Sequence, residues 1–151
     1  MNRSVEYVLS EAPFVVRRTV RWADCDPAGV VYTGRFTEYL LSAVMHFTNH
    51  LGFGPDLPAN GKSGIGLPCK HMSLTFHVSL YPGDVVDLRV GVGEIREHTF
   101  DIVAEAFLAD GRLAFEGRFS PVCIRGDVRE RTPIPEVLRR ALIPYLTNRE
   151  N

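Results

Sequence analysis

A long apolar helix is the clearest signal in this chain. Within residues 32–52, apolar side chains recur at spacings of three and four, the period of an α-helix with one buried face: Phe36, Leu40, Ala43, Val44, Phe47 and Leu51. Leu41 and Met45 lie outside that stripe, which leaves the helix only a narrow polar side. We therefore expect other elements to wrap around most of this helix.

The segments on both sides of the helix change to the period-two pattern of β-strands. Strands are expected at residues 14–22, at 70–84, and within 85–125, where three strands are divided near residues 96–98 and at Asp110-Gly111. The glycine-rich and proline-rich segment 52–68 is expected to form a loop. Residues 133–146 are expected to form a short helix whose last turn is weakened by Pro144.

This order of elements predicts an α+β fold in which an antiparallel sheet of about five strands wraps around one long central helix. The 151 residues are expected to form a single domain, 1–151. An open sheet of this size leaves exposed edges, which are commonly covered by a second copy of the chain. The sequence therefore predicts a homo-oligomer, either a dimer or a tetramer.

Charge and composition exclude several classes of partner. Seventeen basic and eighteen acidic residues give a net charge of -1, so we expect neither nucleic acid nor a membrane surface as a partner. No apolar run reaches the length of a membrane span, and a cytoplasmic location is expected. Cys25, Cys69 and Cys123 form no C-x-x-C pair, which predicts reduced, buried thiols and no metal site.

Unusual residues are concentrated in the turn before the helix, WADCDPAGVVYTG (22–34). Asp24, Asp26 and Gly29 match the first, third and sixth positions of a calcium loop. The match fails at the fifth position, Ala28, and at the twelfth, Arg35, where the loop needs a bidentate glutamate. A phosphoryl-transfer aspartate would follow a fully apolar parallel strand in a larger α/β domain, and neither is indicated here.

Backbone chemistry suggests a third use for this turn. Pro27 disfavours a helical conformation at Asp26, and Gly29 permits a tight turn before the helix. The unpaired N–H groups at Tyr32, Thr33 and Gly34 would then stabilise a carbonyl oxygen that gains negative charge. Asp26 would attack that carbonyl group or activate water. In the alternative interpretation Asp26 only caps the turn or the helix, and the residues alone leave both open.

The stretch DCDPAGVVY (24–32), followed by a long helix, resembles the signature of the 4-hydroxybenzoyl-CoA thioesterase family of hotdog-fold proteins. The resemblance extends from the first expected strand to the last, and includes Pro82-Gly83-Asp84. It implies a hotdog fold and hydrolysis of an acyl-CoA or acyl-carrier thioester, with no cofactor besides the CoA of the substrate.

The resemblance also implies roles for individual residues. Asp26 corresponds to the catalytic carboxylate, supported by Asp24 and Gly29, while Tyr32 occupies an aromatic position and the main-chain N–H of Thr33 polarises the thioester carbonyl. The segment Arg96, Glu97, His98 and Thr99 lies where basic residues meet the CoA phosphates, although Glu97 replaces a second arginine. Gly66, Leu67 and Pro68 correspond to a segment that lines the acyl pocket of the neighbouring subunit.

Two other functions remain alternatives. A hotdog hydratase or dehydratase would need a histidine a few residues from the aspartate, and none occurs between Asp26 and His46. A non-catalytic acyl-thioester-binding protein would be expected to lack the carboxylate, which is present. His46 and His50 have the spacing of a zinc pair but no third ligand, so we expect them to be packing or surface residues.

Overall fold

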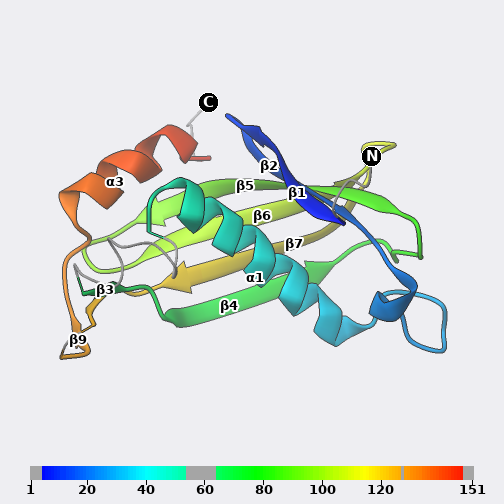
Figure 1. The fold of residues 1–151 in the computed structure, drawn as a ribbon, viewed down its shortest axis with the longest axis horizontal. Helices are drawn as coiled ribbons and strands as arrows, with labels where there is room; N and C mark the ends of the chain where they lie inside the picture. The colour runs from blue at the N-terminus through cyan, green and yellow to red at the C-terminus, as the bar shows by residue number, and fades with distance from the viewer. Residues whose placement is uncertain (1–4, 54–63, 127, 148–151) are drawn as a thin grey trace.

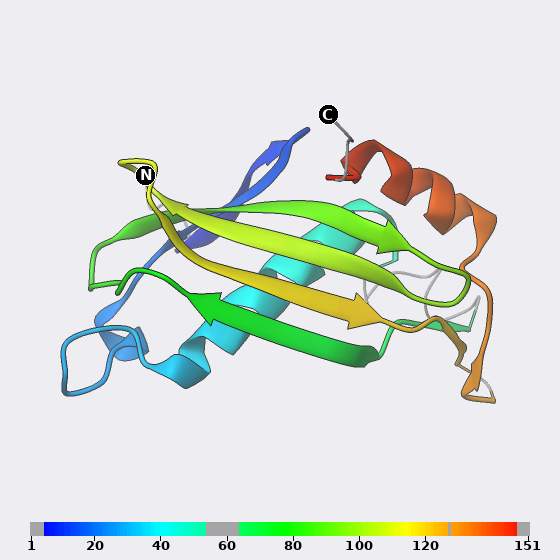
Figure 2. The same cartoon turned by 180° about the vertical axis from the view of Figure 1, so that it is seen from behind.

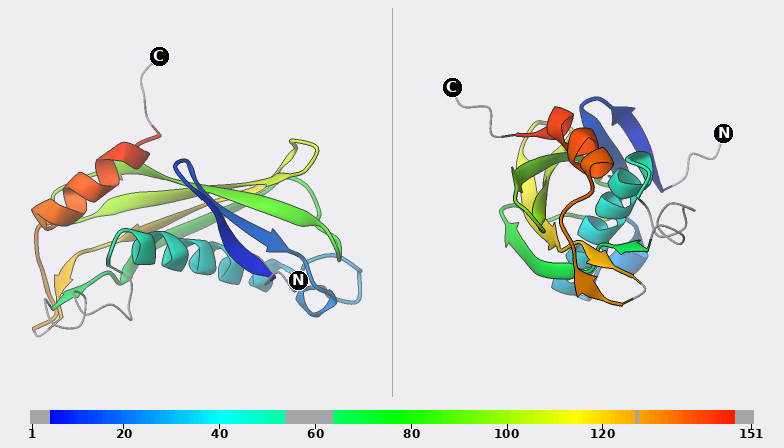
Figure 3. Two further views of the ribbon diagram at one scale, coloured as in Figure 1. Left: turned by 45° about the horizontal axis from the view of Figure 1, so that its top comes forward. Right: turned by 90° about the vertical axis from the view of Figure 1, so that its left-hand side faces the viewer.

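A curved antiparallel sheet of six strands wraps around one long helix (Figure 1; Figure 3). The computed structural model describes residues 5–53, 64–126 and 128–147. The strand order is β1-β2-β5-β6-β7-β4. The strands are β1 (Glu6–Glu11), β2 (Phe14–Thr19), β4 (Cys69–Phe76), β5 (Val85–Ile95), β6 (Phe100–Leu108) and β7 (Leu113–Pro121).

Helix α1 (Thr33–His50) lies in the concavity of this sheet, and the opposite face of the sheet is seen from behind (Figure 2). Three short strands form a second sheet in the order β3-β8-β9: β3 (Ile65–Gly66), β8 (Ile124–Arg125) and β9 (Glu130–Arg131). The chain continues into α3 (Glu136–Leu142) and the 3-10 turn η2 (Ile143–Tyr145), and Pro144 occurs where the regular helix has ended.

The apolar stripe of α1 forms the centre of the core, as its spacing predicts. Phe36, Leu40, Ala43, Val44 and Phe47 are buried against the inner face of the sheet. The helix approaches β7 closely at Gly117, where a β-carbon would lie about 3.1 Å from the methyl groups of Leu40. Gly117 therefore sets the distance between helix and sheet, and with it the position of the helix N-terminus.

The sheet has six strands rather than the expected five, because β1 pairs with β2 in a hairpin. Tyr7, Val8 and Leu9 are consecutive apolar residues in β1, so the strand has no period-two alternation to indicate it. The first expected strand also ends early, at Thr19. Trp22 begins a 3-10 turn, η1 (Trp22–Asp24), and its side chain is 79% exposed.

The two edges of the main sheet differ. At one edge, β1 is bulged between Val8 and Ser10, and its Glu6 carboxylate accepts a hydrogen bond from Ser42 on α1. At the other edge, β4 pairs on one side only, with β7, through every residue except Lys70, where the register shifts. The described structure therefore leaves β4 as a long open edge, which is the type of edge that pairs with another chain.

Part of the expected loop 52–68, residues 54–63, lies outside the described residues. In the described portion of the chain, no helix is both long enough and apolar enough to cross a membrane.

Candidate active site

The turn before α1 folds as a small closed loop. Cys25 and Val31 form a β-bridge, and within it the N–H of Asp26 donates to the carbonyl of Val30 at 3.1 Å. Gly29 closes the turn with a φ of 85°, in the left-handed region that favours glycine, and donates its N–H to the carbonyl of Asp26. The N–H of Val31 also donates to the carbonyl of Leu80, which fixes the loop beyond the end of β4.

Asp24 is the buried centre of this region, with a fully inaccessible side chain. Its Oδ2 accepts a 2.7 Å hydrogen bond from the Tyr39 hydroxyl and a 3.0 Å hydrogen bond from the main-chain N–H of Arg21. Arg18 approaches Oδ2 and Arg35 approaches Oδ1, each with a nitrogen at 3.5 Å. The main-chain carbonyl of Asp24 accepts the N–H of Tyr32 at 3.2 Å. Through these contacts Asp24 links Arg21, at the start of the turn, to Tyr32, the residue that precedes α1.

The partners of Asp24 keep its carboxylate ionised. Burial by itself would raise the pKa of Asp24, but hydrogen bonds from Arg21 and Tyr39 and the charges of Arg18 and Arg21 outweigh that effect, and the pKa lies below its ordinary value. Burial, together with the hydrogen bond to Asp24, raises the pKa of Tyr39 far above its ordinary value. The Tyr39 hydroxyl therefore stays protonated and donates its hydrogen bond to the ionised Asp24 carboxylate.

Asp26, the carboxylate to which the resemblance gives the catalytic role, is exposed in the single chain. Its Oδ1 accepts a 2.8 Å hydrogen bond from the N–H of Ala28, so in the isolated chain the side chain caps its own turn. Oδ2 has no hydrogen-bond donor among the described residues. The carboxylate is thus held at the corner of the loop with one oxygen open to a ligand.

Helix α1 begins at Thr33, with Tyr32 as the extended N-cap residue. The expectation of an unpaired N–H at Tyr32 was wrong, because this group donates to the carbonyl of Asp24. The N–H groups of Thr33 and Gly34 have no acceptor among the described residues, and such groups at a helix N-terminus attract negative charge. Arg35 adds a positive charge in this first turn. It lies against the Tyr32 ring, with its guanidinium carbon 5.4 Å from the ring centre, and donates to the carbonyl of Ala23 at 3.2 Å.

The expected CoA-binding residues Arg96, His98 and Thr99 form the turn after β5, at the end of the sheet near β3 and β9 (Figure 1). The turn before α1 lies at the opposite end, so one chain does not bring these groups together with Asp26. The Arg96 guanidinium is held by Asp101, with two contacts of 3.0 and 2.9 Å, and by Glu94. The His98 side chain is mostly covered.

The segment Gly66, Leu67 and Pro68 lies at the same end as the Arg96 turn. Gly66 ends β3 and is packed against Ile124 of β8. Within one chain this segment is also remote from Asp26, and the resemblance assigns it to the pocket of a neighbouring subunit. Phe47 is a core residue, as the apolar stripe predicts, and Tyr39 is one as well; both are too buried to contact a ligand directly.

The cysteines correct one expectation. Cys123 is buried, and burial raises its pKa to about 11. Cys25 is half-buried, but Cys69 is exposed because it begins the open edge strand β4.

No group of three or more potential metal ligands occurs within the described part of the chain. His46 lies 3.6 Å from Glu6, and His50 contacts the Tyr145 hydroxyl at 2.9 Å.

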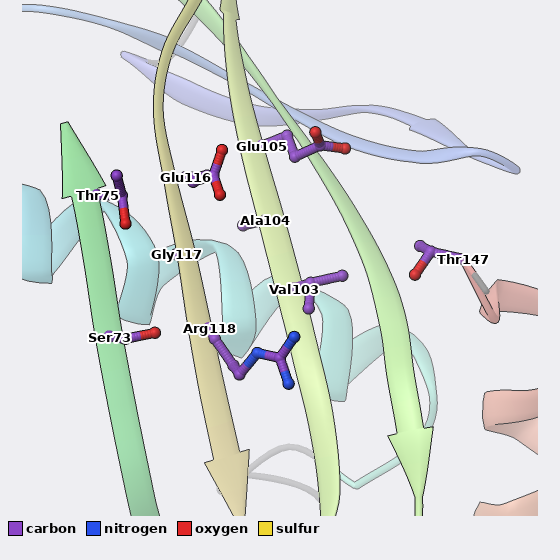
Figure 4. A pocket seen from close by; sticks show the side chains of 9 residues that line it. All are labelled: Ser73, Thr75, Val103, Ala104, Glu105, Glu116, Gly117, Arg118 and Thr147. Carbon is purple, nitrogen blue, oxygen red and sulfur yellow. The ribbon is translucent and has the colours of Figure 1, made fainter. Parts of the chain in front are cut away.

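A cavity of about 240 Å³ lies on the outer face of the sheet, away from α1 (Figure 4). Glu105 and Glu116 are direct cross-strand neighbours there, and Arg118 lies beside them. None of the residues that the sequence assigns to catalysis lines this cavity.

The sequence analysis did not identify Arg18 and Arg35 as ion-pair partners of Asp24.

The family model described as the thioesterase-like superfamily matches residues 20–142, which include the whole turn, α1 and the main strands that follow. The chain belongs to this superfamily. The prediction of a hotdog-fold thioesterase family is therefore confirmed, and thioester hydrolysis is the activity of the family.

Similar proteins and structures agree with this membership. A 1,4-dihydroxy-2-naphthoyl-CoA hydrolase from Microcystis aeruginosa is 29% identical over 138 residues, which cover 88% of this chain and 94% of that protein. The structure of a 1,4-dihydroxy-2-naphthoyl-CoA thioesterase from Synechocystis has 25% identity and a TM-score of 0.74, covering 86% of this chain and 95% of that one. A gentisyl-coenzyme A thioesterase structure has 25% identity and a TM-score of 0.71, covering 85% and 98%.

Proposed function

We propose that this thioesterase-superfamily chain hydrolyses an aromatic acyl-CoA thioester, with Asp26 as general base or nucleophile and the N-terminus of α1 as the oxyanion site. The observation that carries the proposal is the pairing of two features on one short loop. Asp26 presents a carboxylate oxygen without a donor, and Thr33 and Gly34 present N–H groups without an acceptor among the described residues.

The chemistry follows from these groups. When the thioester carbonyl oxygen accepts the Thr33 N–H, the carbonyl carbon becomes more electrophilic and the developing oxyanion is stabilised. As a base, Asp26 removes a proton from water while the water oxygen bonds to that carbon. Collapse of the tetrahedral intermediate breaks the carbon–sulfur bond, and the departing thiolate takes up the proton. As a nucleophile, Asp26 would form a mixed anhydride that water then hydrolyses.

The site requires a second copy of the chain in this proposal. Antiparallel pairing of two β4 edges about a two-fold axis would bring the start of β4 in one copy beside the end of β4 in the other. The Arg96 turn and Gly66 lie toward the start of β4, and the Asp26 loop is tied by Val31 and Leu80 beyond its end. Each Asp26 would therefore be completed by the other copy.

The aromatic acyl group is proposed from the relatives, because hydrolases of 1,4-dihydroxy-2-naphthoyl-CoA and of gentisyl-CoA are both similar to this chain. A panel of CoA thioesters, followed by thiol release, tests this step. Naphthoyl-type and benzoyl-type thioesters should give a much higher kcat/KM than acetyl-CoA or palmitoyl-CoA. Preference for an aliphatic chain would contradict the aromatic assignment while leaving thioester hydrolysis intact.

A further inference from the structure

Arg35 is a basic residue at the wrong end of α1 for helix stability. It is the third residue of the helix, and residues 33–36 include no acidic side chain. The positive end of the helix dipole lies at this terminus, where basic residues destabilise a helix and acidic residues stabilise it. Helix formation therefore does not explain an arginine at this position, and its contacts point to another role.

The Arg35 guanidinium joins α1 to the loop that carries Asp26. Its Nη1 donates a 2.6 Å hydrogen bond to Oε2 of Glu38, one turn further along the helix. Its Nη2 donates a 3.2 Å hydrogen bond to the main-chain carbonyl of Ala23 in the loop. The side chain is only 25% exposed, so most of the group is covered by its neighbours. Two nitrogens of one planar group thus hold the loop at a fixed place beside the helix.

The third nitrogen of Arg35 faces the buried aspartate of the loop. Nε lies 3.5 Å from Oδ1 of Asp24, and both atoms are buried with no hydrogen-bond partner among the described residues. An approach of about 0.5 Å would bring the pair to ordinary hydrogen-bond distance. The unmet donor and the unmet acceptor therefore favour any arrangement that draws Arg35 closer to Asp24.

The ring of Tyr32 is packed between the first turn of α1 and Arg35. A β-carbon at Gly34 would lie only 2.8 Å from Cε2 of this ring, so the ring occupies the space that a side chain at Gly34 would need. The guanidinium carbon of Arg35 lies 5.4 Å from the ring centre, within the range of a cation–π contact. The ring is therefore held beside the N–H groups of Thr33 and Gly34, for which the described residues provide no acceptor.

We propose that Arg35 is a positioning residue for the thioester carbonyl. By tying the loop and the Tyr32 ring to α1, it holds the Thr33 N–H where the carbonyl oxygen can accept it. The carboxylates of Asp24 and Glu38 offset its charge, so the planar shape of the guanidinium carries the role. This inference rests on the proposed function, because it names a residue that supports the oxyanion site of that reaction.

The test compares Arg35→Lys and Arg35→Gln with the wild type. Lysine keeps the charge but has neither the planar fork nor the flat face of a guanidinium, so it should not rescue the function. In both variants kcat should fall roughly 10–100-fold with KM close to the wild type, because a small displacement of a catalytic group slows the chemical step. Arg140→Lys is the matched control, since Arg140 hydrogen-bonds Glu136 on α3 in a similar helical pair, and it should match the wild type.

A second variant keeps the test informative if the Arg35 variants unfold. Glu38 is 58% exposed, so Glu38→Ala should leave the thermal midpoint unchanged while it removes the helix-side partner of Arg35. We expect kcat to fall roughly two- to fivefold, the range that corresponds to the loss of an exposed ion pair. An unchanged kcat in Glu38→Ala, together with unfolded Arg35 variants, would show that Arg35 is structural only.

A spectroscopic measurement distinguishes positioning from stability. In an Asp26→Asn background, which slows turnover, the carbonyl stretching frequency of a bound aroyl-CoA should lie below that of the free thioester, because the Thr33 N–H polarises the carbonyl. Adding Arg35→Lys should move the frequency back toward the free value, whereas adding Arg140→Lys should not change it. An equal frequency in all three proteins would overturn the positioning role.

The kinetic outcomes separate this inference from the proposed function. If the wild type hydrolyses the aroyl-CoA and Arg35→Lys does so at the same rate, the role of Arg35 is wrong although the proposed function stands. If Arg35→Lys is fully active and Arg35→Gln is not, the charge rather than the planar shape matters, and the positioning role is also wrong. If the wild type hydrolyses no thioester of the panel, the proposed function fails and this role fails with it.

Discussion

The hydroxyl of Tyr39, on the second turn of α1, donates a 2.7 Å hydrogen bond to Oδ2 of Asp24 in the turn that precedes the helix. Both side chains are almost completely buried, and the acceptor is ionised. This contact joins the helix to the loop that presents Asp26. The two aspartates of the motif therefore differ: Asp24 is buried and positions the loop, whereas Asp26 is exposed and open to substrate.

Tyr39→Phe should destabilise the fold. Removing the hydroxyl leaves a buried carboxylate with one donor fewer, which costs about 1.5–3 kcal/mol for a hydrogen bond to a charged group. For a chain of this length we expect the thermal midpoint to fall by roughly 3–12 °C. Tyr81→Phe is the matched control, because Tyr81 is exposed and its loss of a hydroxyl should leave the midpoint unchanged. Equal midpoints for both variants would argue against the contact.

Asp24→Asn and Asp26→Asn should behave differently. Asp24 faces two arginines and a tyrosine hydroxyl, so the amide should lower both the thermal midpoint and kcat through displacement of the loop. Asp26 is exposed, so its amide should leave the midpoint nearly unchanged. Thermal unfolding followed with activity on the same samples distinguishes the two roles. A strong destabilisation by Asp26→Asn would show that its turn hydrogen bond is structural.

Acid should unfold the protein partly through Asp101. Burial raises the pKa of this carboxyl, but hydrogen bonds from Arg96 and Ser120 and the charges of Arg96 and Arg118 hold it below its ordinary value. The stabilisation is therefore fully present above the unfolded-state pKa of about 3.9 and is lost as the pH falls below it through the folded-state pKa. Urea unfolding measured from neutral to acidic pH should show that the free energy of unfolding falls more steeply for the wild type than for Asp101→Asn. If the free energies of unfolding of the two proteins depend on pH in the same way, the Asp101 carboxylate is not the source of the acid sensitivity.

The open edge of β4 predicts how the chain associates. Met72 lies on β4 and is 38% exposed, and Met45 on α1 is 46% exposed. Met72→Glu should place a like charge from each copy near the two-fold axis and shift the protein toward monomer, with loss of activity. Met45→Glu is the control: because Met45 lies on α1 and not on the β4 edge, this variant should still form the dimer. Light scattering at micromolar concentration measures both, and a monomeric wild type would contradict the proposed completion of the site.

Sequence periodicity was sufficient for α1, whose apolar stripe is buried, and for the strands from β4 to β7. In β4 the apolar residues alternate although the strand is exposed in the single chain. Periodicity missed β1, whose apolar residues are consecutive, and the early end of the strand at Thr19. The motif located Asp24, Asp26 and the helix start, since these are close in the chain. It did not identify Tyr39 as a partner of Asp24, because that contact depends on how α1 packs.

The same limit applies to the buried carboxylate of Asp101. The sequence directed attention to Arg96 and His98 in one turn, whereas Asp101 accepts hydrogen bonds from Arg96 and also from Arg118 and Ser120 of a neighbouring strand. These contacts depend on how β6 and β7 pair, which has no local sequence signal. The roles of Asp26 and Thr33 in catalysis remain predictions.

Turnover by Asp26→Asn tests the central claim most directly. With the best aroyl-CoA substrate of the panel, kcat should fall by about 10²–10⁴, the contribution of a positioned general base, while KM stays close to that of the wild type. Light scattering and thermal unfolding should confirm an intact assembly. If Asp26→Asn turns over every thioester of the panel as fast as the wild type, Asp26 is not the catalytic carboxylate.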